Sequence, residues 1–369
     1  NCSMRLGLAS TFPPYRGGIA QFNAAAARAL LAAGHEVVTV TWSRQYPKLL
    51  FPGTSQWEPG KSLSDVEMPA LLDCLSPVSW HRTAEYLAER CDVVVLPFWH
   101  AALAPALTGV AKSSKRRGMK EVWALMHNAS SHDGNGIHRR LTNRFLQQAD
   151  RVFTLSNPVS EALRPWNPTT LFHPLYDQHP RGPRREEARR QLGLNSGDRV
   201  HLFFGLIRPY KGLHLAIEAL SQLPLHHKLV IAGECYGSWE PYHNQIQELG
   251  LEDRVIVHRE FIDDGLVPFY FSATDDVVLP YTQASQSGVT ALALHHNRAV
   301  VASNVGDLSN TIVPELTGRI VPPGDATALA YAMREDWNAQ PADIQGAFEQ
   351  VKKRLSWSEW VNRLMQPAG

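Results

Sequence analysis

The stretch FFGLIRPYKGL, from Phe203 to Leu213, decides how the second half of the chain is expected to fold. An apolar run ends at Gly205, the basic residues Arg208 and Lys211 follow, and an apolar segment with helical spacing begins directly after them. This order predicts a buried β-strand, a short loop and an α-helix. In a parallel sheet such a loop lies at the carboxyl end of its strand, where ligands commonly bind.

Apolar runs separated by helix-length segments continue through both halves of the chain. Strands that alternate with helices in this way predict parallel, doubly wound sheets. The runs interpreted as strands are MRLGLAS (4–10), HEVVTVTW (35–42), VVVLPFW (93–99), EVWALMH (121–127), RVFTLS (151–156), RVHLFFG (199–205), KLVIAGE (228–234), RVIVH (254–258), DDVVLP (275–280), RAVVAS (298–303) and GRIVPP (318–323).

Length and a change in composition predict two domains. A chain of 369 residues exceeds one ordinary hydrophobic core. Between the halves, QHPRGPRREEARRQ is polar, charged and proline-containing, which is typical of a linker that runs into a short helix. We expect an N-terminal domain at residues 1–177, a linker at 178–195 and a C-terminal domain at 196–355.

The terminal segment, residues 356–369, is expected to return to the first domain. Trp357 and Trp360 lie three positions apart in it, so on a helix they form one apolar stripe. Such a stripe needs an apolar partner, and the N-terminal domain is the one that we expect to provide it.

Charge and cysteine usage disfavour several classes of protein. Lysine and arginine number 36 against 35 acidic residues, so no basic field favours nucleic acid as a partner. The four cysteines lack CxxC spacing and no metal-ligand set has a convincing spacing, so we expect neither a metal nor a cofactor. No apolar run reaches the ~20 residues of a transmembrane segment, and the residues before Met4 lack the apolar core of a signal peptide. A soluble, cytoplasmic protein is expected.

Arg208 and Lys211 are the first candidates for binding an anion. Gly205 leaves room for a ligand close to the backbone, and the helix after Gly212 offers its positive dipole end. A guanidinium fork and an ammonium point charge together suit a diphosphate. The alternative is a pair of solvated surface cations.

A second candidate anion site is the turn in YTQASQSGVTALAL, residues 281–294. Gln286, Ser287, Gly288 and Val289 lead from a strand into an apolar helix, so successive backbone amides could point at a phosphate. The alternative is an ordinary serine N-cap.

Two glycines, Gly17 and Gly18, separate the first predicted strand from the first helix. They lack Cβ atoms, so a ligand could approach the backbone closely there, although a tight turn explains them as well. No GxGxxG follows the strand, which disfavours a nicotinamide enzyme.

The segment MHNASSHDG, residues 126–134, places proton-handling groups at the end of a first-domain strand. His127 is the principal candidate there, and His132 and Asp133 are secondary ones. A histidine that serves only the fold is the alternative.

The basic run KSSKRRGMK, Lys112 to Lys120, has two interpretations. It is either a solvated turn or, if the substrate is carried on an anionic membrane, a docking patch. Peripheral contact with the inner face of the cell membrane therefore stays open.

Together these stretches resemble the retaining glycosyltransferases of family 4, which have two Rossmann-like domains facing each other across a cleft, the GT-B type. The fold class implied is α/β with two doubly wound parallel-sheet domains. The resemblance covers nearly the whole chain, and the motifs that carry it are RGGI, FFGLIRPYKGLHLAIEAL, VIAGE, DDVVLPYTQASQSGV, RAVVASNVGDLSN, LTGRIVPPGD and SWSEWV.

The resemblance implies a role for each candidate residue. Arg208 and Lys211 would grip the donor diphosphate and stabilise the departing nucleotide without a metal ion. Gly18 would lie in the loop that approaches the donor phosphates, and the amides from Ser287 to Val289 would cap the distal phosphate. His127 would lie near the donor sugar.

The chain departs from the family pattern at two positions. The family commonly carries two glutamates eight positions apart around the second turn, one for the sugar hydroxyls and one for the ribose. The corresponding positions are Ala284 and Leu292. Gln283 or Gln286 could take the sugar-side role, whereas a leucine accepts no hydrogen bond from a ribose.

The function implied is a metal-independent, retaining transfer of a hexose from a UDP- or GDP-linked sugar. The acceptor would be a hydroxyl of a glycan, glycolipid or polysaccharide precursor, glycan- or lipid-linked, in cell-envelope synthesis. Two alternatives stay open. One is a catalytically inactive binding or scaffold protein, which the missing glutamates favour, and the other is a nucleotide-sugar epimerase on the same architecture.

Overall fold

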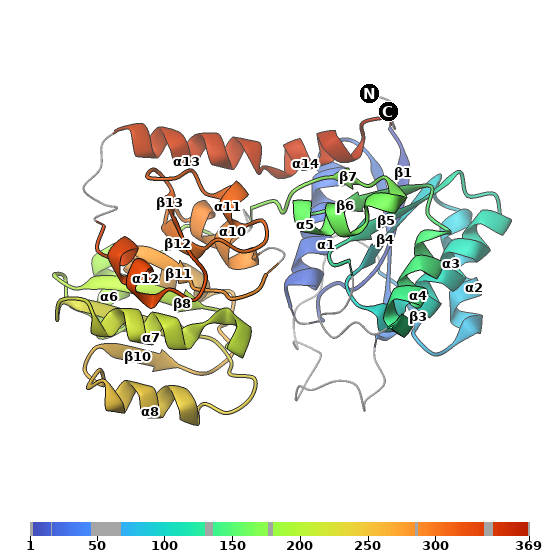
Figure 1. Ribbon diagram of the computed structural model, residues 1–369. Coiled ribbons are helices and arrows are strands. Elements are labelled where there is room, and N and C mark those ends of the chain that lie inside the picture. The colour runs from blue at the N-terminus through green and yellow to red at the C-terminus, as the bar shows by residue number, and fades with distance from the viewer. Residues whose placement is uncertain are drawn as a thin grey trace. The chain divides into compact units, whose positions relative to one another are not determined.

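The computed structural model describes residues 3–15, 17–45, 68–129, 136–175, 180–284, 287–335 and 342–367. The chain forms two compact units, one of residues 1–172 with 357–369 and one of residues 173–356. Each unit contains one parallel β-sheet with helices on both faces (Figure 1). The prediction of two doubly wound parallel sheets is therefore confirmed.

The sheet of the first unit has the strand order β3-β2-β1-β4-β5-β6-β7. Its strands are β1 (Arg5–Ala9), β2 (Glu36–Arg44), β3 (Ala70–Asp73), β4 (Val93–Phe98), β5 (Glu121–Met126), β6 (Arg151–Thr154) and β7 (Thr169–Thr170). Its helices are α1 (Gly18–Ala32), α2 (Pro77–Ala88), α3 (Ala104–Arg116), α4 (Gly136–Leu146), α5 (Asn157–Ala162) and α14 (Trp357–Leu364).

Strand order decides which face of this sheet each helix covers. The chain steps one way along the sheet from β1 to β2 and the other way from β4 to β5 and β6. Because crossovers between parallel strands are right-handed, these opposite steps place α1 on one face and α3 and α4 on the other. The helices α2, α3 and α4 pack side by side (Figure 1). With both faces covered, β4 is buried along its whole length.

The terminal helix α14 packs against α1 within the first unit. The ring of Phe22 on α1 lies 5.2 Å from that of Trp357 and 5.8 Å from that of Trp360, measured between centroids. Beyond the helix, Arg151 donates a hydrogen bond of 2.7 Å to the carbonyl of Gln366. The two tryptophans three positions apart thus form one buried stripe.

The sheet of the second unit has the strand order β10-β9-β8-β11-β12-β13. Its strands are β8 (Arg199–Phe204), β9 (His227–Ala232), β10 (Val255–His258), β11 (Asp276–Leu279), β12 (Ala299–Ser303) and β13 (Gly318–Val321). Its helices are α6 (Arg185–Gln191), α7 (Leu213–Ser221), α8 (Glu240–Glu248), α9 (Val267–Ala273), α10 (Gly288–His295), α11 (Leu308–Thr311), α12 (Ala326–Met333) and α13 (Ala342–Arg354).

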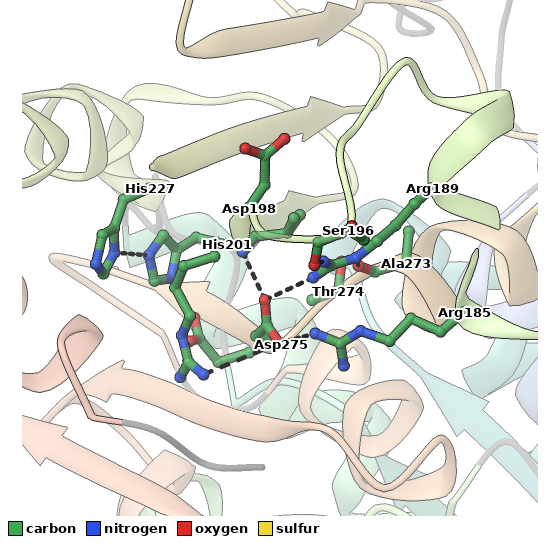
Figure 2. A network of polar contacts seen from close by, with 12 residues as sticks. Arg185, Arg189, Ser196, Asp198, His201, His227, Ala273, Thr274 and Asp275 are labelled. Atoms are coloured by element: carbon green, nitrogen blue, oxygen red, sulfur yellow. Dashed lines mark hydrogen bonds and ion pairs between the residues drawn. The ribbon is translucent and has the colours of Figure 1, made fainter. Parts of the chain in front are cut away.

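A buried ionic network joins α6 to the amino ends of β8 and β11 (Figure 2). The carboxylate of Asp275 accepts hydrogen bonds from Arg189, at 2.9 Å, from the Val200 amide, at 2.6 Å, and from Arg185. Burial raises the pKa of Asp275, but the Val200 amide and Arg185 outweigh it and leave the pKa below its usual value. The carboxylate is therefore charged, and it fixes the amino edge of the sheet, opposite the loops that follow β8 and β11.

Two buried histidines extend this network along the sheet. His201 Nδ1 lies 2.7 Å from a carboxylate oxygen of Asp276, and His201 Nε2 lies 2.9 Å from Nδ1 of His227. If neutral His201 donates a hydrogen bond from Nδ1 to Asp276, its Nε2 accepts one from Nδ1 of His227. Burial, and then the charges of His201 and other neighbours, lower the pKa of His227 to about 3. His227 is accordingly neutral near pH 7.

We expect the second unit to lose stability as the pH falls from about 6.5 towards 3. An unfolded histidine titrates near pH 6.5, so in this range unfolding takes up a proton at His227. His227 alone then lowers the free energy of unfolding by roughly 1.4 kcal/mol for each pH unit. Burial lowers the pKa of His173 to about 4, so this histidine adds to the slope above that pH. Denaturant unfolding at several pH values measures this slope. His227→Gln, which keeps a donor for His201, should reduce it, and an unchanged slope would contradict the assignment.

Candidate active site

The loop after β8 is shaped by two glycines in the left-handed region. Gly205, at φ 92°, turns the chain, and Ile207 then continues the pairing with the segment after β9 by accepting from the Tyr236 amide at 3.0 Å. Gly212, at φ 67°, is the N-cap of α7, and a Cβ atom there would lie 1.9 Å from the carbonyl oxygen of Pro280. Only glycine allows the loop to approach the end of β11 this closely.

The loops after β8 and β11 are joined by hydrogen bonds. Both the amide and the hydroxyl of Thr282 donate to the carbonyl of Tyr210, at 2.8 and 3.1 Å. A Cβ atom on Gly205 would lie 3.6 Å from Lys211 Nζ and equally far from a methyl carbon of Val289. The structure thus brings the two sequence-predicted anion sites together at the carboxyl edge of one sheet.

Two cations, Arg208 and Lys211, lie at this edge. Among the residues that the structure describes, no carboxylate lies within ion-pairing distance of Arg208 or Lys211. Each cation instead lies near an aromatic ring: Arg208 is 5.0 Å from the ring centroid of Tyr236, and Lys211 Nζ is 5.5 Å from that of Tyr281. These contacts orient the two side chains without neutralising their charge.

The surroundings of Lys211 favour a bound anion. Burial lowers the pKa of Lys211 below its usual value, and the charge of Arg208 lowers it further against an opposing effect of Tyr210. Burial raises the pKa of Tyr281 to about 12, so this ring stays uncharged. An anion placed beside Lys211 and Arg208 would supply the missing countercharge and stabilise both cations.

The turn before α10 uses its serine as a helix cap. Ser287 Oγ accepts from the Val289 amide at 3.3 Å and lies 3.3 Å from the hydroxyl of Tyr281. The Val289 amide, one of those that the sequence offers to a phosphate, therefore already donates to the Ser287 side chain. Gly288 is the first residue of α10. Gln286 lies outside the described residues.

In the first unit, the candidate glycines precede α1. Gly17 is the N-cap of the helix at φ 108°, and its carbonyl accepts from the Ala20 amide at 3.1 Å. A Cβ atom at Gly17 would meet nothing within 4 Å, so the backbone conformation, and no protein neighbour, requires the glycine. Gly18 is the first residue of α1 and is exposed.

His127 lies at the carboxyl end of β5 and is only 2 % exposed. Its amide donates to the carbonyl of Phe98 at 2.8 Å, and its ring meets the ring of Phe22 edge to face, with centroids 4.8 Å apart. His127 is thus packed against the helix that Gly17 caps. Its role near a donor sugar stays a prediction, and His132 and Asp133 lie outside the described residues.

Little in the sequence indicates that several other residues lie at these sheet edges. Tyr236 and Tyr281 orient the two cations, but each is a single tyrosine after an apolar strand. Trp99 and His100 follow β4 directly, and Asn128 donates to the carbonyl of Trp99 at 3.1 Å. In the sequence, only the tryptophan and the histidine at the end of the run VVVLPFWH indicate polar or aromatic side chains at this edge.

The positions of the two family glutamates carry no carboxylate. Leu292 is buried within α10, 9 % exposed, and Ala284 lies in the loop before this helix. The exposed Gln283 is the polar side chain next to Ala284. No group of three or more His, Cys, Asp or Glu suited to a metal ion occurs in the described part of the chain.

Two protein-family profiles match the chain. Residues 17–171 match a glycosyl transferase 4-like domain, and residues 198–337 match the glycosyl transferases of group 1. The chain belongs to the GT-B glycosyltransferases. The two matches fall on the two sheets described above, one on each.

Curated relatives of this glycosyltransferase are about 28 % identical over part of the chain. The O-antigen chain mannosyltransferase C of Escherichia coli is 28 % identical over 214 residues, 55 % of either protein. The D-rhamnosyltransferase WbpZ of Pseudomonas aeruginosa is 28 % identical over 230 residues, 59 % of this chain and 58 % of WbpZ. The chain spans about half the length of the curated relatives that it matches.

Solved structures show the same fold over nearly the whole chain. Anabaena HepE, solved in complex with UDP and glucose, has a TM-score of 0.74 at 18 % identity and covers 98 % of both chains. Sucrose-phosphate synthase of Thermosynechococcus elongatus has a TM-score of 0.73 at 21 % identity and covers 98 % of this glycosyltransferase and 97 % of its own chain. At these identities the likeness concerns the fold. No helix among the described residues is long and apolar enough to cross a bilayer.

Proposed function

We propose that this glycosyltransferase moves a hexose from a nucleoside-diphosphate sugar to a hydroxyl of a glycan, glycolipid or polysaccharide precursor. The observation that carries the proposal is the pair of cations, Arg208 and Lys211, beside the glycine edge at Gly205 and without acidic partners in the described chain. A diphosphate is the ligand chemistry that a guanidinium and an ammonium group fit together.

The same two side chains would act in the chemical step. Negative charge grows on the diphosphate as the sugar–oxygen bond breaks, and cations already in place stabilise that charge without reorganisation. The leaving nucleotide then needs no metal ion. Retention of configuration would follow if the acceptor hydroxyl attacks from the face that the leaving group vacates.

Names of related proteins support the substrate classes. HepE is described in complex with UDP and with UDP-glucose, which supports a nucleotide-sugar donor. The relative described as an O-antigen chain mannosyltransferase supports an acceptor of the polysaccharide-precursor class, and the one described as a D-rhamnosyltransferase supports the transfer of a sugar. The nucleotide and the sugar are left to experiment.

Release of nucleoside diphosphate tests the proposal. The protein is incubated with UDP- and GDP-linked hexoses, in EDTA and then in magnesium, with and without extracts of lipid-linked or soluble glycans. A transferase releases the diphosphate in proportion to acceptor, in EDTA as well as in magnesium. An epimerase would convert one nucleotide sugar into another without acceptor, and this outcome would replace the proposal.

A binding protein without turnover is the second candidate function, and Ala284 and Leu292 favour it. Both stand where a carboxylate would hold the sugar or the ribose, and neither can accept a hydrogen bond through its side chain. In that case the nucleotide sugar binds, but adding an acceptor releases no nucleoside diphosphate, and the sugar is not converted into another one. Calorimetric binding together with the release assay separates the two functions.

A further inference from the structure

The outer face of α4 carries three arginines and no acidic residue. Its inner face is apolar and packs into the first unit, where the ring of Phe145 stacks on that of Phe98 with centroids 5.6 Å apart. On the opposite side Arg139, Arg140 and Arg144 are exposed. Within the described residues none of these three arginines has an ion-pair partner.

An exposed isoleucine lies on the same face. Ile137, Arg140 and Arg144 follow at spacings of three and four and therefore line one side of the helix. The side chain of Ile137 is 62 % exposed. Arg139 lies in the first turn, where the helix dipole disfavours a cation. The dipole favours Arg144, which lies in the last turn, but it explains neither Arg139 nor Arg140.

This face reaches the edge of the sheet where ligands are expected. Because α4 follows β5, its first turn lies at the carboxyl edge, and the ring of His138 lies 6.1 Å from that of His100, just after β4. Leu75 and Val78, at the start of α2, reach the same edge and are 58 % and 61 % exposed. With Ile137 they are the large apolar side chains of the first unit that are more than half exposed, among the residues described.

The basic run from Lys112 to Lys120 lies at the other edge. Its cations are partly neutralised: Lys115 Nζ lies 2.6 Å from Asp150 and Lys120 Nζ lies 3.0 Å from Asp92. Both aspartates precede strands, so they mark the amino edge of the sheet. Arg116 and Arg117, which are exposed and have no ion-pair partner among the described residues, also lie near the amino edge, at the end of α3. The α4 arginines differ from them in position, because α4 begins at the carboxyl edge, which carries the candidate site.

We propose that the α4 face, formed by Ile137, Arg140 and Arg144 with Arg139 at its flank, docks on the surface of an anionic phospholipid bilayer. Arginines near such a surface are attracted by lipid phosphates, and an exposed apolar side chain among them enters the interface. A helix that is apolar inside and basic outside fits this partner by charge complementarity. Docking would bring the carboxyl edge of the first sheet next to the lipid, and it does not depend on which donor the protein uses.

Cosedimentation of the whole chain with vesicles tests the proposal. We expect binding to vesicles of mixed phosphatidylcholine and phosphatidylglycerol, little binding to phosphatidylcholine alone, and loss of binding as salt is raised. The triple variant Arg139→Gln, Arg140→Gln, Arg144→Gln should lower the partition coefficient about a hundredfold. Ile137→Ser should lower it several-fold, by removing an apolar contact that salt does not screen.

A matched variant on α3 controls for total charge. Lys112→Gln, Arg116→Gln, Arg117→Gln removes the same charge and should keep most of the binding. The proposal fails if the wild-type chain ignores anionic vesicles, if it binds neutral vesicles equally well, or if the α3 variant loses as much binding as the α4 variant. Circular dichroism and nucleotide binding of each variant show that the fold and the donor site are intact.

Discussion

Replacing both Arg208 and Lys211 by alanine is expected to raise the dissociation constant for the cognate nucleoside diphosphate by roughly 10²- to 10⁴-fold. Each side chain would lose a hydrogen bond between charged groups, a contribution of about 1.5 to 3 kcal/mol. Calorimetric titration in EDTA measures the effect. Arg184→Ala with Arg190→Ala, which removes two exposed charges from α6 and its N-cap, is the matched control.

The pH dependence of binding provides a second readout of the same site. Burial lowers the pKa of Lys211, so this cation is lost at a lower pH than an ordinary lysine would be. Affinity should therefore fall as the pH rises towards that lowered pKa, and in Arg208→Ala the fall should move to higher pH. Equal affinity of the wild type and the double variant for the nucleotide would show that Arg208 and Lys211 do not bind the diphosphate, and the proposed donor site would be wrong.

The variant Asp275→Asn is expected to lower the free energy of unfolding of the second unit by about 3 to 5 kcal/mol. The Asp275 carboxylate and the Arg189 guanidinium are 2 % and 4 % exposed, so neither charge can be compensated by water once its partner is lost. Asparagine keeps the size of the side chain but removes the countercharge of Arg189 and Arg185. Denaturant unfolding measures the loss.

Hydrogen exchange places the effect of Asp275→Asn in the structure. The amide of Val200 donates to Asp275, so it should lose protection together with the start of β8. Adding Arg189→Met should recover part of the stability, because no buried guanidinium is then left without its countercharge, although the three carbonyls to which Arg189 donates lose a donor. Glu161→Gln, in a pair whose side chains are both more than three quarters exposed, should change nothing measurable. A neutral Asp275→Asn would show that the ionic network does not hold α6 to the sheet.

The strands could be predicted largely because parallel sheets covered on both faces select continuous apolar runs. The run VVVLPF of β4 and the run LFF within β8 are of this kind, and their pattern does not depend on distant residues. The strand β3, ALLD, escaped prediction. It is four residues long and only partly buried, so its pattern is too short to separate from a loop.

The charged residues of the candidate site could be predicted from the sequence, but the aromatic residues that orient them could not. A glycine followed by Arg208 and Lys211 after a strand indicates an anion site, because the position in the sheet follows from the local sequence. The rings of Tyr236 and Tyr281, which orient the cations, lie in the loops after β9 and β11. No local sequence pattern connects these tyrosines to Arg208 and Lys211. The segment RREEARRQ illustrates the same limit: it looks like solvated linker and helix, yet Arg189 within it is 3 % exposed.

Two stretches of backbone lead into and out of the second unit, and they pair with each other there, with the amide of Leu175 donating to the carbonyl of Leu355 at 3.0 Å. In topological terms the second unit is an insertion into the first, and this hydrogen bond holds the two ends of the insertion together. A continuous gene fragment can therefore encode all of the second unit. No continuous fragment encodes the first, because Trp357 and Trp360, which cover Phe22, are reached only after the whole insertion has been made. The first sheet is therefore expected to complete its core last during synthesis, although its strands are made first.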